Sequence, residues 1–131
     1  MNFTPQLITD LILIKPTIHE DSRGYFAETF RQDLFEDAVG YKVDFIQDNE
    51  SQSIKGVLRG LHYQLPPYAQ SKLVRVLEGR VLDVAVDIRK SSPTFGQHVA
   101  VELTEENNHQ LFIPRGFAHG YLVLSESATF S

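Results

Sequence analysis

The feature that most constrains this chain is a succession of short apolar runs, rich in β-branched residues and closed by turns. Runs of this length are typical of strands, and their close spacing disfavours the alternating helices of a βαβ fold. We therefore predict an all-β sandwich or barrel. The predicted strands are Leu11–Ile14, Tyr25–Phe30, Val43–Ile46, Gly56–Tyr63, Lys72–Leu77, Val81–Ile88, His98–Leu103, Gln110–Ile113, Ala118–Leu124 and a last one from Ala128 to Ser131.

Turn residues separate these runs. The Glu-Gly pair at 78–79, between two runs, predicts a hairpin. The segments 21–24, 91–96 and 105–108 have the composition of turns and loops. The last run stops at Ser131 with no turn after it, and we expect a barrel that lacks its C-terminal strands.

One short helix is predicted, at Asp33–Val39. Asp33 and Glu36 have the spacing of a capping box, in which each side chain bonds the other residue's backbone. Gly40 follows at the position where a left-handed residue ends a helix.

Composition limits the function classes. The chain has 131 residues, which suits one domain spanning 1–131, and its net charge is −5 with both signs interleaved. That balance argues against general binding to nucleic acid or to an anionic membrane. The chain has no cysteine, and its first residues resemble neither a signal peptide nor a membrane span, so we expect a cytoplasmic protein.

Two of the five histidines lie in informative surroundings. Pro114-x-Gly116-x-x-His119 has the spacing of a turn that returns a histidine into a small jelly-roll barrel, as in the second cupin motif. Gly56 stands six positions before His62, as at the start of the first cupin motif, which continues with further metal ligands.

The metal ligands of that first motif are replaced here. Gln64 occupies the second ligand position, and Lys72 occupies the position of the expected carboxylate. An ammonium group repels a divalent ion, so we predict no metal site. An imidazole beside a cation can instead remove a proton and stabilise the resulting oxyanion. The alternative is that Lys72 points to solvent on an edge strand.

The sequence permits two assignments of the residues that share a face with His62 on its strand. Simple alternation places His62 and Arg59 on opposite faces. A bulge at Gly60 would re-aim the strand and change that assignment.

Two aspartates alternate with apolar residues in Val81–Ile88. Asp83, Ala85 and Asp87 share one face, and an antiparallel strand most often turns such a face to solvent. In the other interpretation, Asp83 points into the barrel and pairs with His62 or Lys72.

Several further polar residues lie in strand-like or turn segments. An arginine offers a fork for phosphate, and amide side chains can bind the edge of a pyrimidine. Each is a weak signal alone, and Gln47–Asn49 also has the composition of a turn. These candidates are Arg23, Glu28, Gln47, Asn49 and Arg59.

Taken together, the segments DSRGYFAETF, FIQDNES, KGVLRGLHYQLPPYAQSKLVRVLEGRVLDVAVDIRKSSPTFG and LFIPRGFAHGYLVL resemble one family. They are similar to the dTDP-4-dehydrorhamnose 3,5-epimerases, from about Leu11 to the end of the chain. The resemblance implies a cupin β-barrel and a metal-independent isomerase without cofactor that acts on a nucleotide sugar in rhamnose biosynthesis.

The resemblance also implies residue roles. His62 matches the general base and Lys72 the cation that stabilises the enolate, while Asp83 is a candidate orienting carboxylate from the strand pattern alone. In the family the N-terminal strand crosses to a partner, which implies a homodimer with shared sites. The positions that match substrate contacts are Arg23, Phe26, Glu28, Gln47, Asp48, Asn49, Arg59 and His119.

Two departures leave alternatives open. The family's acid tyrosine, and the carboxylate that orients the base, are expected beyond the last residue, since neither Tyr63 nor Tyr121 matches that tyrosine. Glu50 stands where close relatives often have histidine. The alternatives are a related 3-epimerase or ketoisomerase, a metal-dependent cupin, and a chain that binds nucleotide sugar with little activity.

Overall fold

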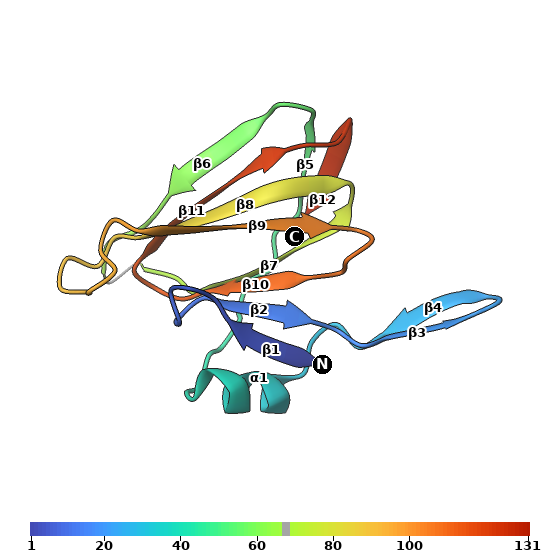
Figure 1. Cartoon of the computed structure of the whole chain (residues 1–131), viewed down its shortest axis with the longest axis horizontal. Coiled ribbons are helices and arrows are strands. Elements are labelled where there is room, and N and C mark those ends of the chain that lie inside the picture. Colours follow the sequence, from blue (N-terminus) through green and yellow to red (C-terminus); the bar gives the residue numbers. More distant parts are fainter. Residues whose placement is uncertain (67–68) are drawn as a thin grey trace.

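The computed structural model describes residues 1–66 and 69–131, and strands dominate it (Figure 1). This confirms the all-β prediction. The elements are β1 (Asn2–Pro5), β2 (Ile12–Lys15), β3 (Ile18–Asp21), β4 (Gly24–Ala27), α1 (Gln32–Val39), β5 (Ser51–Ile54), β6 (Leu58–His62), β7 (Lys72–Glu78), β8 (Arg80–Asp87), β9 (His98–Thr104), β10 (Gln110–Ile113), β11 (Phe117–Val123) and β12 (Ser127–Phe130).

Two antiparallel sheets form the body of the molecule. One has six strands in the order β1-β2-β10-β7-β12-β5, and the other has four in the order β6-β11-β8-β9. Neighbouring strands are mostly far apart in sequence, so long-range pairing holds the barrel together. The β3–β4 hairpin forms a separate two-stranded sheet that projects from the body (Figure 1).

Apolar side chains from both sheets fill the space between them. Val74 and Leu111 of the six-stranded sheet belong to the same buried cluster as Val81, Leu103 and Val123 of the four-stranded sheet. Burying one such side chain contributes about 1.5–3 kcal/mol. This cluster therefore fixes how the two sheets face each other, and with that the position of every inward side chain.

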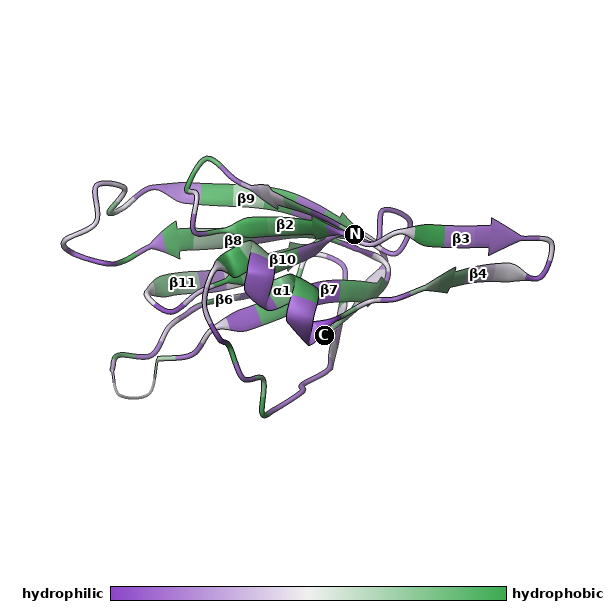
Figure 2. Cartoon of the chain, turned by 90° about the horizontal axis from the view of Figure 1, so that it is seen from below, coloured by the Kyte–Doolittle hydropathy of each residue, from purple (hydrophilic) through white to green (hydrophobic). Residues whose placement is uncertain are grey.

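Helix α1 covers the outer side of the six-stranded sheet (Figure 2). Its buried residue, Phe35, packs edge-on against Phe112 of β10 with ring centroids 4.9 Å apart. Ile12 and Ile14 of β2 complete this second cluster. Within the described ranges, no helix is long and apolar enough to cross a membrane.

The ends of α1 follow the prediction only in part. Gly40 is left-handed and donates its N–H to the carbonyl of Glu36 at 2.8 Å, as predicted. The capping box is not formed, because the helix begins one residue earlier and Arg31 is its N-cap. Asp33 instead forms an ion pair with the Arg31 guanidinium at 2.6 Å.

Two predicted elements were wrong. Residues 43–46 form no strand, because Val43 packs into the helix cluster and its carbonyl accepts a hydrogen bond from Gln32. The Glu78–Gly79 connection is no hairpin, since β7 and β8 lie in different sheets. Gly79 has a φ of 89°, and a Cβ there would lie 2.2 Å from the Ser127 carbonyl oxygen. Glycine thus permits this tight crossing between the sheets.

Candidate active site

The inner face of β8 is buried although it carries two carboxylates. Asp83 and Asp87 are both fully buried, with Ala85 between them. Leu82 and Val84, on the other face, are only half-buried. The expectation of a solvated aspartate face was therefore wrong, because alternation shows which residues share a face and not which face the second sheet covers.

Asp83 is paired with His119 inside the barrel. The His119 Nε2 lies 2.7 Å from the Asp83 Oδ1, and His119 is only 6% exposed. In the part of the chain that the structure describes, the second oxygen, Oδ2, is buried without a hydrogen-bond partner. Burial raises the pKa of Asp83, against the opposing effects of His119 and Lys72. Asp83 thus points inward as one interpretation held, but its hydrogen-bond partner is neither His62 nor Lys72.

Lys72 begins β7, in the opposite sheet, and its side chain is half-buried. Burial lowers the pKa of the Lys72 ammonium, and the nearby charge of Asp83 partly restores it. The protein environment thus changes the proton affinity of this ammonium in two opposite ways. The ammonium is therefore not fully solvated, although, among the described strands, only β10 pairs with the chain at Lys72 and β12 pairs with β7 from Arg75 onward.

A bulge in β6 brings His62 and Arg59 to one face. On the paired strand β11, His119 lies opposite His62, and Tyr121 lies opposite Arg59. His119 and Tyr121 are two residues apart and share a face, whereas His62 and Arg59 are three apart, so β6 carries one extra residue. Simple alternation was therefore wrong, and the bulge interpretation is confirmed.

Two glycines make this bulge fit against β11. Gly60 has a φ of 120°, which disfavours any residue with a side chain. A Cβ on Gly60 would lie 2.7 Å from the Gly120 Cα and 2.8 Å from the His119 carbonyl oxygen. The close approach of these two backbones therefore positions His62 and Arg59 beside the buried histidine.

Two serines of β5, which the sequence pattern does not mark as site residues, contact this region. The Ser53 Oγ accepts a hydrogen bond from the Arg59 Nε at 2.7 Å, and Ser51 shares one with the Tyr121 hydroxyl at 2.7 Å. Their i, i+2 spacing was the available signal, but β5 is only four residues long and largely polar.

A second aspartate, Asp87, has a fully satisfied environment. Its carboxylate accepts hydrogen bonds from the backbone and guanidinium of Arg89 and from the hydroxyls of Ser92 and Thr94. Arg89 also contacts Asp10, at 2.5 Å. These donors, Arg89 above all, hold the pKa of Asp87 well below its usual range. The network anchors the 88–97 loop.

The other predicted contacts lie apart from the histidine pair. Arg23, Phe26 and Glu28 belong to the projecting hairpin and the residue just after it, and all three are exposed. Arg23 pairs with Asp21 of the same turn at 2.5 Å. The three residues at 47–49 are also exposed, in the irregular segment before β5.

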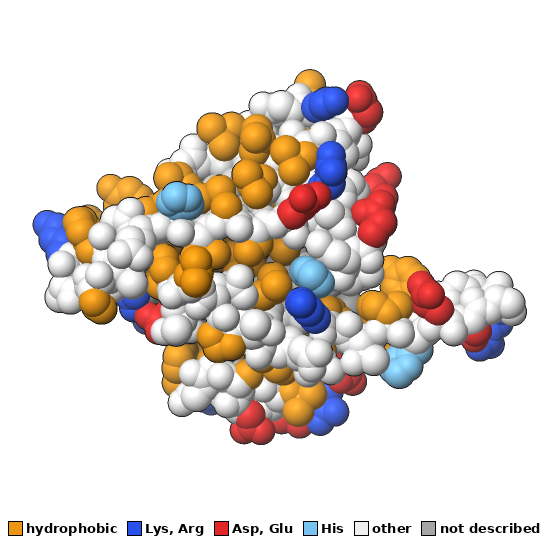
Figure 3. All heavy atoms as spheres, viewed as in Figure 1, with side chains coloured by type: hydrophobic (Ala, Val, Ile, Leu, Met, Phe, Trp, Pro, Cys, Tyr) orange, Lys and Arg blue, Asp and Glu red, His pale blue; other side chains and the backbone are white. Residues whose placement is uncertain are grey.

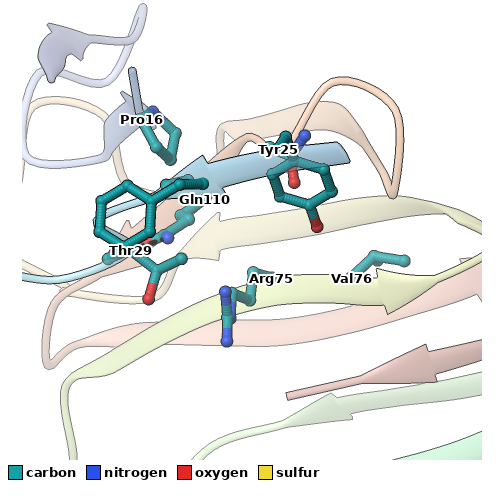
Figure 4. A pocket seen from close by; sticks show the side chains of 9 residues that line it. Pro16, Tyr25, Thr29, Arg75, Val76 and Gln110 are labelled. Carbon is teal, nitrogen blue, oxygen red and sulfur yellow. Dashed lines mark hydrogen bonds between the residues drawn. The ribbon is translucent and has the colours of Figure 1, made fainter. Parts of the chain in front are cut away.

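A pocket of about 360 Å³ lies at the base of the hairpin rather than at the histidines. Tyr25 and Thr29 line it from the hairpin side, and Arg75 and Gln110 line it from the barrel (Figure 4). Phe26 is the one predicted contact in its lining. The histidines His62 and His119 lie instead with the buried carboxylate of Asp83, whose charge acts on Lys72.

The assembled groups are suited to moving protons. His62, the His119–Asp83 pair and Lys72 provide a proton acceptor, an oriented imidazole and a cation. Among residues 1–66 and 69–131, no group of three His, Cys, Asp or Glu side chains has the placement of a metal site. An all-β barrel with this interior site defines a cupin-fold isomerase.

Comparisons with known proteins give the particular family. A family model described as dTDP-4-dehydrorhamnose 3,5-epimerase matches residues 5–131. The dTDP-4-dehydrorhamnose 3,5-epimerase of Shigella flexneri is 61% identical over 130 residues, which are 99% of this chain and 72% of that protein. The chain belongs to the dTDP-4-dehydrorhamnose 3,5-epimerase family.

Solved structures agree with this assignment. The crystal structure of dTDP-4-dehydrorhamnose 3,5-epimerase from Elizabethkingia anophelis NUHP1 matches with a TM-score of 0.94 at 52% identity, over 99% of this chain and 71% of that chain. A dTDP-6-deoxy-D-glucose-3,5-epimerase from Legionella pneumophila Philadelphia 1, in complex with dTDP-4-keto-L-rhamnose, matches with a TM-score of 0.94 at 53% identity, over 98% and 68%.

Proposed function

We propose that this chain converts dTDP-4-dehydro-6-deoxy-D-glucose to dTDP-4-dehydro-L-rhamnose, with His62 as the general base and Lys72 as the stabiliser of the enolate. The observation that carries the proposal is the register of β6 on β11. It places His62 opposite the buried His119–Asp83 pair, with Lys72 close enough to Asp83 for their charges to interact. Family membership supplies the substrate class.

The chemistry follows from the 4-keto group. The neutral imidazole of His62 takes the proton from carbon 5, and the C–H electrons form a carbon–carbon double bond as the C4 oxygen becomes an enolate. The ammonium of Lys72 offsets this negative charge. A general acid on the opposite face, a tyrosine in the family, donates the proton that inverts the carbon. Proton exchange with water restores this acid and His62, and the same steps at carbon 3 complete the reaction. Substrate and product are isomers, so no oxidant or reductant is required.

The remaining predicted residues are proposed to bind the substrate. Arg59 shares a face with His62 and presents a guanidinium, which suits the diphosphate. His119, held by Asp83, contacts the sugar. The proposed nucleotide contacts are Arg23, Phe26, Glu28, Gln47, Asp48 and Asn49.

Isotope exchange tests the assignment of the base. In deuterated water, the wild-type protein should introduce deuterium at carbons 3 and 5 of the substrate. His62→Ala should lose about 10²–10⁴-fold of this rate, the usual contribution of a general base. The matched control is His98→Ala, an exposed histidine on β9, which should exchange at the wild-type rate. Full exchange by His62→Ala would refute the proposal, and exchange at carbon 3 alone would indicate a 3-epimerase.

We also propose that the chain works as a homodimer in which the β3–β4 hairpin reaches the partner's site. An isolated two-stranded sheet is marginally stable, and this hairpin leaves Tyr25 and Phe26 65% and 69% exposed. Apolar side chains also gather on the surface formed by β6, β11 and β8 (Figure 3). Leu58 is 69% exposed there, and Leu122 of β11 lies between it and the half-buried Leu82. An apolar surface of this kind marks an association site.

Mixing two inactive variants tests this arrangement. If Arg23 serves the partner's site, Arg23→Ala and His62→Ala should each be inactive alone. After the subunits are exchanged, half of the dimers are mixed, and each mixed dimer has one intact site, so about a quarter of the wild-type activity should return. No recovery from subunits shown to exchange would mean that Arg23 acts within its own chain or not at all.

We further propose that the reaction needs no metal or cofactor and takes place in the cytoplasm. Lys72 occupies the position of a cupin carboxylate ligand, and the chain has no cysteine. Protein dialysed against EDTA should therefore retain its exchange rate. A loss of exchange that added iron, manganese or zinc restores would contradict the first part. Recovery in a membrane or periplasmic fraction of cells would contradict the second.

A further inference from the structure

Two inward hydroxyls on β5 connect the two sheets at the edge nearest to the site. Ser51 and Ser53 share the inner face of this strand, which ends the six-stranded sheet. Their partners, Tyr121 and Arg59, belong to the four-stranded sheet. The two hydrogen bonds are each 2.7 Å long. These side-chain hydrogen bonds therefore connect β5 to the four-stranded sheet, with which it shares no strand pairing in the described part of the chain.

The bond from Ser53 determines how Arg59 presents its guanidinium. A guanidinium has five N–H donors in a rigid plane. Ser53 accepts from Nε, and the Gln52 carbonyl accepts from Nη2 at 3.4 Å. Among the described residues, Nη1 has no hydrogen-bond partner, and the Arg59 residue as a whole is exposed. The terminal edge of the fork is thus free for an anion, while the inner edge is fixed.

The two serines hold different kinds of partner. Tyr121 is 6% exposed and stacks on Phe130 with ring centroids 4.0 Å apart, so packing fixes its position independently of Ser51. Arg59 lacks such packing, and a free arginine side chain loses up to about 2 kcal/mol of rotamer entropy when it is ordered. Ser53, itself 7% exposed, supplies a fixed point for that flexible side chain.

We propose that Ser53 is a positioning residue for substrate: its hydroxyl holds the Arg59 Nε so that the terminal nitrogens face the diphosphate before the ligand binds. The inference depends on the proposed function, which assigns Arg59 to the diphosphate. Without the Ser53 hydroxyl, the ligand must order the side chain on binding. One lost hydrogen bond of this kind weakens the diphosphate contact by about tenfold.

Calorimetry with dTDP and with thymidine, which lacks phosphate, tests the inference. Ser53→Ala should bind dTDP about tenfold more weakly, whereas the affinity for thymidine stays within about twofold. KM for the nucleotide sugar should also rise about tenfold, and kcat should stay constant. Ser53→Thr keeps the hydroxyl and should restore the affinity for dTDP. In an Arg59→Ala background, Ser53→Ala should have no further effect.

The matched control is Ser51→Ala, the same change on the same strand face. It removes the bond to Tyr121 and should leave the affinity for dTDP within about twofold of wild type. An equal loss for dTDP and thymidine in Ser53→Ala would indicate general loosening and overturn the proposal. The proposal would also be overturned if Ser53→Ala bound dTDP with wild-type affinity while Arg59→Ala bound it weakly. If the wild-type protein does not bind dTDP at all, the proposed function itself fails.

A measurement on the wild-type protein keeps the inference testable if Ser53→Ala does not fold. Nitrogen-15 relaxation of the arginine Nε–H groups reports their motion without any substitution. In the ligand-free protein the Arg59 Nε–H should have an order parameter near that of rigid backbone, about 0.85. A value below about 0.6 would show a mobile side chain and overturn the proposal.

Discussion

Asp83 and Asp87 stand on the same inward face of β8, four residues apart, and both are fully buried. Their environments nevertheless have opposite effects. Arg89 and two hydroxyls lower the pKa of Asp87, whereas burial raises that of Asp83. Asp83 has one imidazole partner, and its second oxygen has none among the residues that the structure describes. Burial alone therefore does not determine the chemistry of a carboxylate. The number of donors that reach it does.

The difference suggests a structural role for Asp87 and a functional role for Asp83. A carboxylate with every lone pair occupied stabilises its surroundings and has little capacity for anything else. An incompletely satisfied carboxylate beside His119 and Lys72 raises the energy of the empty site and remains available to respond when substrate arrives. We infer that β8 carries stability at its Asp87 end and function at its Asp83 end.

The largest effect on stability is expected at the anchor. Asp87→Asn should lower the free energy of unfolding by about 1.5–3 kcal/mol, because it removes the charge-assisted bonds from Arg89, which keeps only Asp10 as an ion-pair partner. The pKa of Asp87 is lowered on folding, so its contribution is complete above the ordinary value of about 4 and is lost as the pH falls below it. Denaturant titrations should therefore show the gap between variant and wild type shrinking in acid. An unchanged stability at pH 7 would contradict the anchor role.

Asp83→Asn should have the opposite profile. Exchange at carbons 3 and 5 should fall by about 100-fold, because the amide no longer holds His119 and the Lys72 charge as the carboxylate does. The free energy of unfolding should stay within about 1 kcal/mol of wild type, since the variant also removes a buried charge whose pKa is raised by folding. Loss of folding with full specific activity would reverse the comparison.

The alkaline limb of the pH–rate profile should distinguish the two aspartates further. Burial lowers the pKa of Lys72 below its ordinary 10.5, and only its protonated form stabilises an enolate, so activity should be lost as the pH rises through that lowered pKa. Asp83→Asn should move the limb to lower pH, because the carboxylate raises the pKa of the lysine. Asp87→Asn should leave the limb in place. The measurement is kcat/KM between pH 7 and pH 11.

The smallest effect is expected within the anchor network. Ser92→Ala removes one of the hydroxyls that donate to Asp87 and should cost about 1 kcal/mol of unfolding free energy. Arg89 and Thr94 remain in place as donors, so the pKa of Asp87 should stay low. Thermal unfolding measures the loss, and a cost as large as that of Asp87→Asn would mean that the donors act as one unit.

Much of the fold could be predicted from the sequence because its strands are apolar and turn-bounded. Gln110–Ile113 was predicted with its observed bounds, and the strand at Val81–Ile88 was displaced by one residue. β5 was missed because its residues are polar, and its stability comes from pairing with β12. The Glu78–Gly79 crossing could not be predicted, because a Glu-Gly pair fits a hairpin as well as a passage between sheets.

The candidate site could be predicted in its members but not in its contacts. His62 and Lys72 were chosen from motif spacing and Asp83 from strand alternation, and their assigned roles stay predictions. The partner of Asp83 could not be predicted, since it depends on the register of β11 against β8. Whether Arg59 lies beside His62 depends on one inserted residue, which periodicity cannot detect.

That inserted residue has a consequence for how the protein can change. At Gly60 the phase of β6 shifts by one residue, so an odd-numbered and an even-numbered position lie on the same face of the strand. If β6 were straightened with all its residues kept, as a side chain at Gly60 would favour, regular alternation would send one of the two outward, with both side chains intact. The site is therefore encoded in the backbone conformation at Gly60 as well as in the identities of its side chains, and a substitution of this glycine would act like the loss of a functional group.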